Sequence, residues 1–373
     1  MARAHLSAGG LLLALLLVGC GGGQAGPTAA PTASSPVAQK ASASASAAVQ
    51  KPSASTAPAP SAGSLKPIQV AYVALATSTF PTWIADTKGF FKQQGLNAQV
   101  TYVQGSSTAL PALASGNLDV LEAQPAVSVE GQLKGEDTVV LATHIPYADQ
   151  RIVARPEIKT MDDLRGKSIA VSKAGTVTDN VVRWVLQHYK LTPGKDVKVT
   201  YLNTQPGQLA AVQNGLVAAT MIPAPYDLVA EKNGSHLLLD VRTLNYAYPV
   251  DGVVSTRKFV RAHPREIVDY LKAYVMGVRF ARSNPAESKQ ILAKYTKQSD
   301  PAVLDAAYKA QMADWADPPV PFLNGIKTVL PLYPGGAGKN PADFIDPKPM
   351  QQALKELGST GSSGSPSAQP AKS

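Results

Sequence analysis

The chain alternates between short apolar segments and helix-like segments in two separate runs, and this alternation limits its fold more than any other feature. The first run has apolar strands predicted at 68–75, 98–103, 118–121, 138–142 and 151–154. The second has them at 168–171, 197–202, 216–222, 237–241 and 252–255. Helical patterns then follow at 264–282, 285–297, 302–315 and 341–357. Strands that alternate with helices favour parallel sheets with right-handed crossovers. The sequence therefore predicts an α/β fold with two α/β lobes.

Residues 160–180 show the pattern best, as a short helix, a buried strand and a small-residue turn that enters a second helix. Thr160 and Asp163 have the spacing of a capping box. A helix that begins near Thr178 would aim free N–H groups and the positive end of its dipole into the turn from Lys173. Open α/β sheets bind ligands outside the C-terminal ends of their strands. The turn is a candidate ligand site, and the alternative is an ordinary strand–helix link.

The first twenty residues have the composition of a secretory signal. Arg3 precedes an apolar run that is too short to span a bilayer as a resident helix. The run ends in Leu-Val-Gly-Cys, which matches the lipobox of bacterial lipoproteins, so Cys20 is the expected lipidation site. The alternative is a soluble secreted protein with a cysteine there by chance. If Cys20 carries lipid, the mature chain is anchored to a membrane outside the cytoplasm.

Both ends of the mature chain have low-complexity composition. Residues 21–65 are almost entirely Ala, Ser, Pro, Thr, Gly and Gln, and residues 358–373 are similar, so both are predicted to be disordered. Together with the first twenty residues, these ends hold four of the 35 basic residues and none of the 26 acidic ones, which lowers the net charge from +9 to about +5 for the folded part. A mildly basic globule without long Lys/Arg runs does not indicate nucleic-acid binding.

Residue types that would support catalysis are scarce. Cys20 is the only cysteine, so the folded part has no thiol nucleophile, thiolate metal site or disulfide. The histidines are scattered, and no HExxH pattern occurs. Residues 335–340 resemble a P-loop but lack its glycine spacing and its Ser/Thr after Lys339. We therefore predict a non-enzyme with no catalytic residues, no metal and no cofactor.

Several short segments in a fixed order resemble the solute-binding proteins of ABC importers for nitrate, taurine, alkanesulfonates and thiamine-precursor pyrimidines, the NMT1-like family. These segments are 81–85, 89–96, 105–107, 114–120, 163–171, 263–264 and 284–285. The resemblance covers about residues 66–358. One departure is that the second lobe reads Gly-Leu-Val-Ala-Ala at 215–219, where the family often has Gly-x-x-Asp-Ala.

The resemblance implies a type II periplasmic-binding-protein fold, an α/β fold of two lobes with a two-crossing hinge. Lobe 1 would comprise residues 66–155 and 252–357, and lobe 2 would comprise residues 156–251. A small-molecule solute would bind between the lobes and be delivered to an ABC permease with a separate ATPase. The protein would be a monomer, held by its lipid anchor in the periplasm or on the outer face of the cytoplasmic membrane.

In that fold the ligand candidates are the turns after the strands. They are Thr77, Ser78, Thr79, Phe80, Ser106, Ser107, Gln124, Gly175, Thr176, Thr178, Pro223 and Tyr226. Hydroxyls and helix-start amides can hold an oxyanion, although helix N-caps use the same residue types. Phe80 and Tyr226 could instead stack on a ring. Lys173, Tyr246 and Tyr248 are weaker candidates for the same cleft.

Two other functions stay open at this stage. The resemblance also includes enzymes with this fold that make the thiamine pyrimidine. Those enzymes are expected to need Cys- and His-rich stretches, which this chain lacks. A signalling lipoprotein on the same fold would need no closing cleft. The sequence does not distinguish an anionic solute from an aromatic one.

Overall fold

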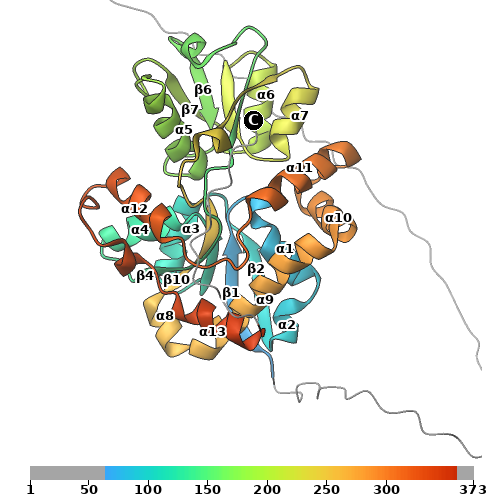
Figure 1. Cartoon of the computed structure of the whole chain (residues 1–373), viewed down its shortest axis with the longest axis vertical. Helices are drawn as coiled ribbons and strands as arrows, with labels where there is room; N and C mark the ends of the chain where they lie inside the picture. Colours follow the sequence, from blue (N-terminus) through green and yellow to red (C-terminus); the bar gives the residue numbers. More distant parts are fainter. Residues whose placement is uncertain (1–63, 359–373) are drawn as a thin grey trace, which may run out of the picture. The chain divides into compact units, whose positions relative to one another are not determined.

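The computed structural model describes residues 64–358, which form two mixed β-sheets flanked by helices (Figure 1). The expected signal segment, Cys20, nearly all of the linker and the tail from residue 359 lie outside the described residues. Within the described part, no helix combines the length and the apolar character that a membrane crossing requires.

The first sheet has five strands. They are β1 (Lys66–Tyr72), β2 (Leu96–Tyr102), β3 (Val120–Ala123), β4 (Thr138–Ile145) and β10 (Asp251–Thr256). The spatial order is β2-β1-β3-β10-β4. β1 runs parallel to β2 and β3, whereas β10 runs antiparallel to β3 and β4. The sheet is therefore mixed, because β10 returns from the other lobe and fills the gap between two strands of the first run.

The second sheet has the same design. Its strands are β5 (Arg151–Ala154), β6 (Ser168–Val171), β7 (Lys198–Tyr201), β8 (Ala219–Ile222) and β9 (His236–Asp240). Their order is β7-β6-β8-β5-β9. β6 runs parallel to β7 and β8, while β5 runs antiparallel to β8 and β9. Each sheet thus contains one inserted antiparallel strand, and the expectation of parallel sheets is corrected at β5 and β10.

The strand β5 also corrects the expected lobe boundary. The sequence analysis assigned residues 151–154 to lobe 1, but β5 pairs with β8 and β9 of the second sheet. The physical reason is Arg151, whose guanidinium lies 2.9 Å from Asp227 Oδ2 and 3.7 Å from Asp240 Oδ2, both in the second lobe. The chain therefore crosses at residues 146–150 and returns at residues 245–251, which end at the first residue of β10, and we call these two segments the crossings.

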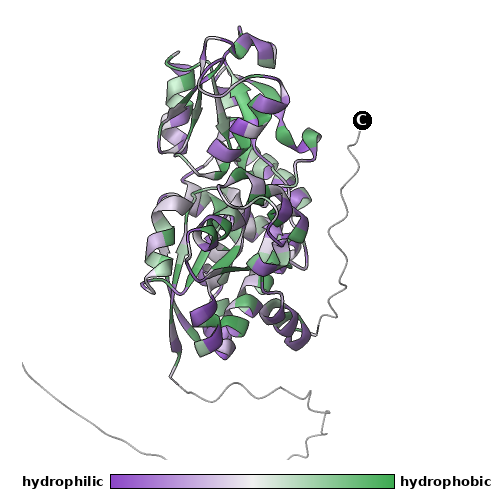
Figure 2. Cartoon of the chain, turned by 90° about the vertical axis from the view of Figure 1, so that its left-hand side faces the viewer, coloured by the Kyte–Doolittle hydropathy of each residue, from purple (hydrophilic) through white to green (hydrophobic). Residues whose placement is uncertain are grey.

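Helices cover both sheets. The first lobe has η1 (Thr77–Thr79), α1 (Phe80–Thr87), α2 (Phe90–Gln93), α3 (Ser106–Ala114), α4 (Pro125–Leu133), α8 (Arg257–Ala262), α9 (Pro264–Ser283), α10 (Pro285–Thr296), α11 (Pro301–Asp314), α12 (Leu323–Val329), η4 (Leu330–Leu332), η5 (Pro341–Phe344) and α13 (Lys348–Glu356). The second has η2 (Met161–Leu164), α5 (Val177–His188), α6 (Gln205–Gln213), α7 (Tyr226–Lys232) and η3 (Val241–Leu244). Figure 2 shows green, apolar strands inside and helices with purple outer faces.

Local signals explain most of the element boundaries. Thr160 and Asp163 form the predicted capping box: the Thr160 hydroxyl accepts from the Asp163 N–H, and the Asp163 carboxylate accepts from the Thr160 N–H. The expected helix over 341–357 is split, because Pro347 disfavours a helical backbone at the residue before it. The sequence analysis did not predict the short helices α8 and α12.

Candidate functional site

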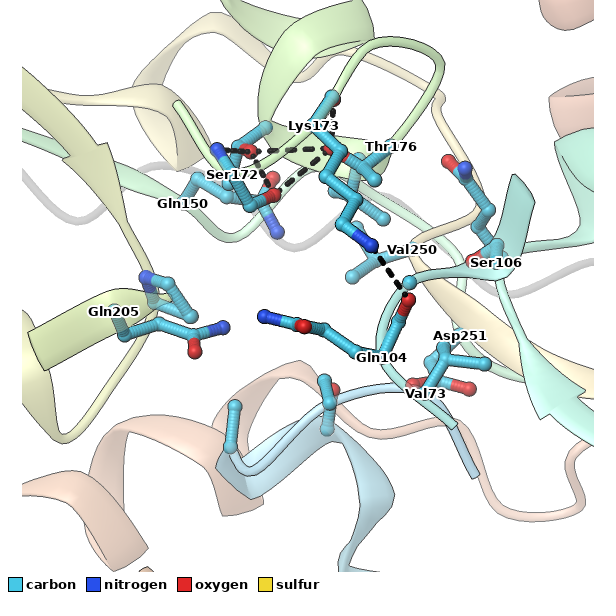
Figure 3. A pocket seen from close by; sticks show the side chains of 18 of the residues that line it. Val73, Gln104, Ser106, Gln150, Ser172, Lys173, Thr176, Gln205, Val250 and Asp251 are labelled. Atoms are coloured by element: carbon cyan, nitrogen blue, oxygen red, sulfur yellow. Dashed lines mark hydrogen bonds between the residues drawn. The ribbon is translucent and has the colours of Figure 1, made fainter. Parts of the chain in front are cut away.

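The described residues enclose a cavity of about 80 Å³ between the two lobes (Figure 3). Most of its lining comes from turns that follow β1, β2, β6, β7 and β8, at the C-terminal ends of the strands, where α/β sheets bind ligands. The two crossings and one residue of α11 complete the wall. The polar lining residues are Thr77, Ser78, Tyr102, Gln104, Ser106, Gln124, Asp149, Gln150, Ser172, Lys173, Thr176, Thr178, Asn203, Gln205, Asp251 and Gln311.

The turn between β6 and α5 contributes three hydroxyls, and we call Ser172, Thr176 and Thr178 the hydroxyl turn. Ser172 Oγ lies 2.9 Å from both Thr176 Oγ1 and Thr178 Oγ1. Thr178 Oγ1 accepts from the Ser172 N–H at 3.1 Å, and Thr176 Oγ1 donates to the Lys173 carbonyl at 2.7 Å. These bonds hold the hydroxyls at the cavity wall beside the first turn of α5 (Figure 3). A neutral, dipolar surface of this kind suits an oxyanion or another polar group.

The first lobe faces this turn with amides. The amide side chains of Gln104 and Gln205, which come from different lobes, point toward each other across the cavity (Figure 3). Gln104 Nε2 donates to the Asn203 carbonyl at 2.8 Å. Gly105, at φ +82°, brings the first-lobe backbone close to the hydroxyl turn, because a Cβ there would lie 3.5 Å from Lys173 Cδ and 3.7 Å from Thr176 Cγ2. The lobes are therefore in contact along this side.

Further hydrogen bonds join the lobes behind the cavity. Gln124 Nε2 donates to the Gly175 carbonyl at 2.7 Å, and Tyr248 OH donates to Gln124 Oε1 at 2.5 Å. Asn180 Nδ2 donates to Tyr248 OH at 2.9 Å and to Tyr333 OH at 3.2 Å. This network links the first lobe, the second lobe and one crossing. The two lobes are therefore in contact behind the cavity as well as beside it.

The crossings place two carboxyl groups on the cavity wall. Asp149 Oδ1 accepts from Gln150 Nε2 at 2.5 Å, and Asp149 Oδ2 accepts from Gln311 Nε2 at 3.3 Å. Burial and the nearby Asp314 carboxylate raise the pKa of Asp149 to about 7. Burial raises the pKa of Asp251 well above its usual value, and the Asp149 charge adds to this. Lys173 is the only Lys, Arg or His among the lining residues, and it donates to the Gln104 carbonyl at 3.3 Å.

Behind Asp251 lies a buried cluster of Glu122, His144 and Asp251, whose ligand-type atoms lie within 4.8 Å of one another. Neither ring nitrogen of His144 is free: Nε2 lies 2.7 Å from the Ser78 carbonyl, and Nδ1 lies 2.7 Å from Tyr274 OH. Burial lowers the pKa of His144 to about 3 and raises that of Glu122, so all three groups favour their neutral forms. We therefore assign the cluster to the polar core of the first lobe.

Seven of the twelve candidate ligand residues line the cavity. They are Thr77, Ser78, Ser106, Gln124, Thr176, Thr178 and Pro223. They come from five separate turns, which the fold brings to one place. Of the weaker candidates, Lys173 also lines the cavity. Tyr246 does not: it is buried and stacks on Trp184, with ring centroids 3.8 Å apart. Tyr248 acts through Gln124 rather than at the wall.

The other five candidates do not line the cavity, and each has a local reason. Thr79 Oγ1 donates to the Ala74 and Ala76 carbonyls. Phe80 is fully buried between Trp83 and Trp315. Ser107 is exposed on α3, and Gly175 offers its carbonyl to Gln124. Tyr226 packs against the apolar cluster of Val153, Ile222 and Ala230.

The sequence analysis missed the lining residues that come from the crossings and from α11, which are Asp149, Gln150, Val250, Asp251 and Gln311. It also missed Ser172, Asn203 and Gln205, although these follow predicted strands and could have been chosen on that ground. No local pattern marks Gln311, because it lies inside a helix. Correct placement of the crossings would have indicated Asp149 and Asp251.

Comparison with known proteins places these features in a family context. The model of the family described as NMT1/THI5 like matches residues 76–288. A Bacillus subtilis (strain 168) protein, named as a candidate binding protein for aliphatic sulfonates, is 25% identical over 238 residues, which is 61% of this chain and 70% of that protein.

Solved structures share the fold. A protein of Bordetella bronchiseptica RB50 gives a TM-score of 0.71 at 23% identity and covers 78% of this chain and 98% of its own. The nitrate-binding protein NrtA of Synechocystis PCC 6803 gives 0.67 at 16% identity, with 79% and 89% covered. The alkanesulfonate-binding protein SsuA of Xanthomonas axonopodis pv. citri, bound to MOPS, gives 0.62 at 21% identity, with 73% and 92% covered. The fold is the type II periplasmic-binding-protein fold.

Proposed function

The chain belongs to the NMT1/THI5-like family, and on that premise we propose that it is the extracytoplasmic solute-binding component of an ABC importer. The observation that carries the proposal is the cavity itself. Turns from both lobes and both crossings enclose it, and interlobe hydrogen bonds close it on two sides. A pocket at the carboxyl ends of the strands of two lobes suits capture of a small solute.

Capture would proceed by closure of one lobe on the other. Only the two crossings connect the lobes covalently, so small backbone rotations there would open the cavity to solvent. The interlobe contacts of Gln104, Gln124 and Lys173 would break on opening and form again on closure. A solute that contacts both lobes adds binding free energy only to the closed form and shifts the population toward it.

The partners follow from this role. The closed protein would dock on an ABC permease, whose separate ATPase supplies the energy. Lipid on Cys20 would hold the protein near that permease, with residues 21–65 as the connecting segment and the folded protein acting as a monomer. We propose no catalytic step for the protein, which fits relatives and structural neighbours that are named as binding proteins.

Two classes of solute are compatible with the family. The names of relatives point to sulfonates or nitrate, and the hydroxyl turn could hold an oxyanion with hydroxyls and helix-start amides. A pyrimidine of the thiamine-precursor type would use the glutamine amides instead. Neither Phe80 nor Tyr226 lines the cavity, so a ring would be held by hydrogen bonds at its edges rather than by these two side chains.

A thermal-shift panel tests the proposal. The purified protein would be screened with sulfonates, nitrate, carboxylates, pyrimidines and small amines near millimolar concentration. A solute present at 100 times its Kd should stabilise the folded state by about 2.7 kcal/mol. Ser172→Ala with Thr178→Ala should reduce the shift, and Ser107→Ala, outside the cavity, is the matched control. A panel without any shift would contradict the proposed function.

A further inference from the structure

We propose that the hinge-side wall of the cavity binds a positively charged nitrogen group of the solute, so that the natural ligand is an organic amine or amidine. The hinge-side wall consists of Asp149, Gln150 and Asp251. The inference rests on the proposed function, since it concerns the same cavity, but it specifies an end group that the names of the relatives do not give.

The first observation is the charge of the lining. Two carboxyl groups, Asp149 and Asp251, reach the cavity from the two crossings, and Asp251 is 3% exposed. Among the lining residues, Lys173 is the one permanent cation. Its ammonium group spans the lobes and lies 3.3 Å from both the Gln104 carbonyl and Thr108 Oγ1. The hinge-side wall therefore carries two carboxyl groups and no basic group, and Asp149 is the one that ionises near neutral pH, since Asp251 favours its neutral form.

The second observation is an unpaired acceptor. Gln150 is 2% exposed and lines the cavity, yet its Oε1 has no hydrogen-bond partner. Its Nε2 is bonded to Asp149, which leaves the carbonyl oxygen as the free end of the amide. A buried carbonyl without a donor costs about 1–3 kcal/mol. A solute N–H group would remove that cost, whereas an oxyanion would increase it.

The charges around Asp149 do not neutralise it. Asp314, on α11, lies close enough to raise the pKa of Asp149, and Asp251 faces it from β10. The nearby cation is Arg242 on η3. Its charge favours ionised Asp149 in part, but its guanidinium is paired with Asp240 and lies 3.5 Å from Asp314. Lys173 is the remaining charged group in the cavity lining. Asp149 thus accepts from the neutral amides of Gln150 and Gln311, but no cation of the cavity lining is paired with it, and a solute cation could take that place.

Proton exchange gives this inference a distinctive signature. With a pKa of about 7, Asp149 holds a proton in part of the solute-free molecules at neutral pH. An ammonium or amidinium group favours the ionised carboxylate, so its binding would release that proton. Affinity for the cation should rise about tenfold from pH 6 to pH 8, because the ionised fraction rises from about one tenth to nine tenths. An anion that accepts from the protonated acid should show the opposite trend.

The experiment uses three probes with the same three-carbon chain: 3-aminopropan-1-ol, 3-aminopropane-1-sulfonate and propane-1-sulfonate. Each is titrated by calorimetry into the full protein at pH 6 and pH 8, in two buffers of different ionisation enthalpy. We expect the two amines to bind with proton release and about tenfold more tightly at pH 8. Failure of both amines to bind, or weaker amine binding at pH 8, would overturn the inference.

Single substitutions test which side chains of the hinge-side wall bind the amine. Asp149→Asn should weaken amine binding by more than tenfold and remove its pH dependence. Gln150→Met, which keeps the volume and removes the acceptor, should weaken it by a smaller factor. The matched control Asp314→Asn keeps every lining residue and should only move the pH midpoint downward. Amine binding that is unchanged in both Asp149→Asn and Gln150→Met would overturn the inference.

The outcomes separate the two proposals. If propane-1-sulfonate binds better than both amines, and more tightly at pH 6, the inference fails while the solute-receptor function stands. If no member of this set or of the broader thermal-shift panel binds, the receptor function itself fails.

Discussion

The hydroxyl turn and the hinge-side wall, the two polar walls of the cavity, differ in how many of their polar groups have hydrogen-bond partners within the protein. The hydroxyls of the hydroxyl turn bond to one another and to the backbone, at distances from 2.7 to 3.1 Å. The hinge-side wall instead has one unpaired carbonyl oxygen and two carboxyl groups with raised pKa values. A wall that is already satisfied can tolerate many polar groups. A wall with an unpaired acceptor, here Gln150 Oε1, selects for a ligand that donates to it.

The largest effect that separates the walls should come from pH. The pKa of Asp149 is about 7 in the folded protein and near 3.8 when unfolded, so the folded state binds more protons between these values. This group therefore removes stability as pH rises from about 4 to 7, and the loss is complete above pH 7. The melting temperature of Asp149→Asn relative to wild type should increase by several degrees across that range.

Differential scanning calorimetry of both proteins from pH 4 to pH 8 measures this difference. Ser172→Ala is the control from the hydroxyl turn, and its offset from wild type should not change with pH. A constant offset for Asp149→Asn would show that the two walls do not differ in this way.

A larger side chain between the lobes should have the next largest effect, which is a loss of solute affinity. Gly105→Val adds an isopropyl group whose Cβ would lie beside Lys173 and Thr176, and overpacking costs about 1–3 kcal/mol. Solute affinity should fall by up to about a hundredfold, because the added volume opposes only the closed form. Gly135→Val is the matched control, since Gly135 also has positive φ but no atom within 4 Å of its would-be Cβ. Equal affinities of the two variants in a titration would contradict the closure account.

Removal of two hydroxyls tests the contribution of the hydroxyl turn to solute affinity. Ser172→Ala with Thr178→Val removes two polar groups at about 1 kcal/mol each, so affinity should fall about thirtyfold. The loss should be the same at pH 6 and pH 8, unlike that of Asp149→Asn. A loss that depends on pH would mean that the hydroxyl turn and the hinge-side wall act as one unit.

The smallest effect is expected for the interlobe bond behind the cavity. Gln124→Met removes the donor to the Gly175 carbonyl, at 2.7 Å, and the acceptor for Tyr248 OH. The closed form should lose about 1 kcal/mol, or about fivefold in affinity. Asn180→Ala, which removes two weaker bonds to tyrosine hydroxyls, is the comparison variant. A larger loss in Asn180→Ala would mean that the bonds from Asn180, rather than those of Gln124, hold the lobes together.

Sequence reasoning predicted the hydroxyl turn better than the hinge-side wall. Thr176 and Thr178 were found because a predicted strand, a small-residue turn and a helix follow one another locally. Asp149 and Asp251 lie at the crossings, and their position depends on which sheet β5 joins. That choice is made by tertiary contacts such as the Arg151–Asp227 ion pair, which no local pattern contains.

The same reasoning explains the mistakes within single turns. Strand ends and helix starts were predicted within a few residues, but the direction of a side chain at a turn depends on backbone angles that the sequence does not state. Phe80 therefore points inward, against Trp83 and Trp315. Ser107 is exposed to solvent, whereas its neighbour Ser106 lines the cavity.

Closure of the two lobes around this cavity by a small solute underlies all of these predictions. Small-angle X-ray scattering of the protein, with and without the solute that gives the largest thermal shift, tests it most directly. The radius of gyration should be smaller with bound solute than without it, and Gly105→Val should show no such change. An unchanged radius of gyration at saturating solute would contradict closure and would favour a role in signalling on the same fold.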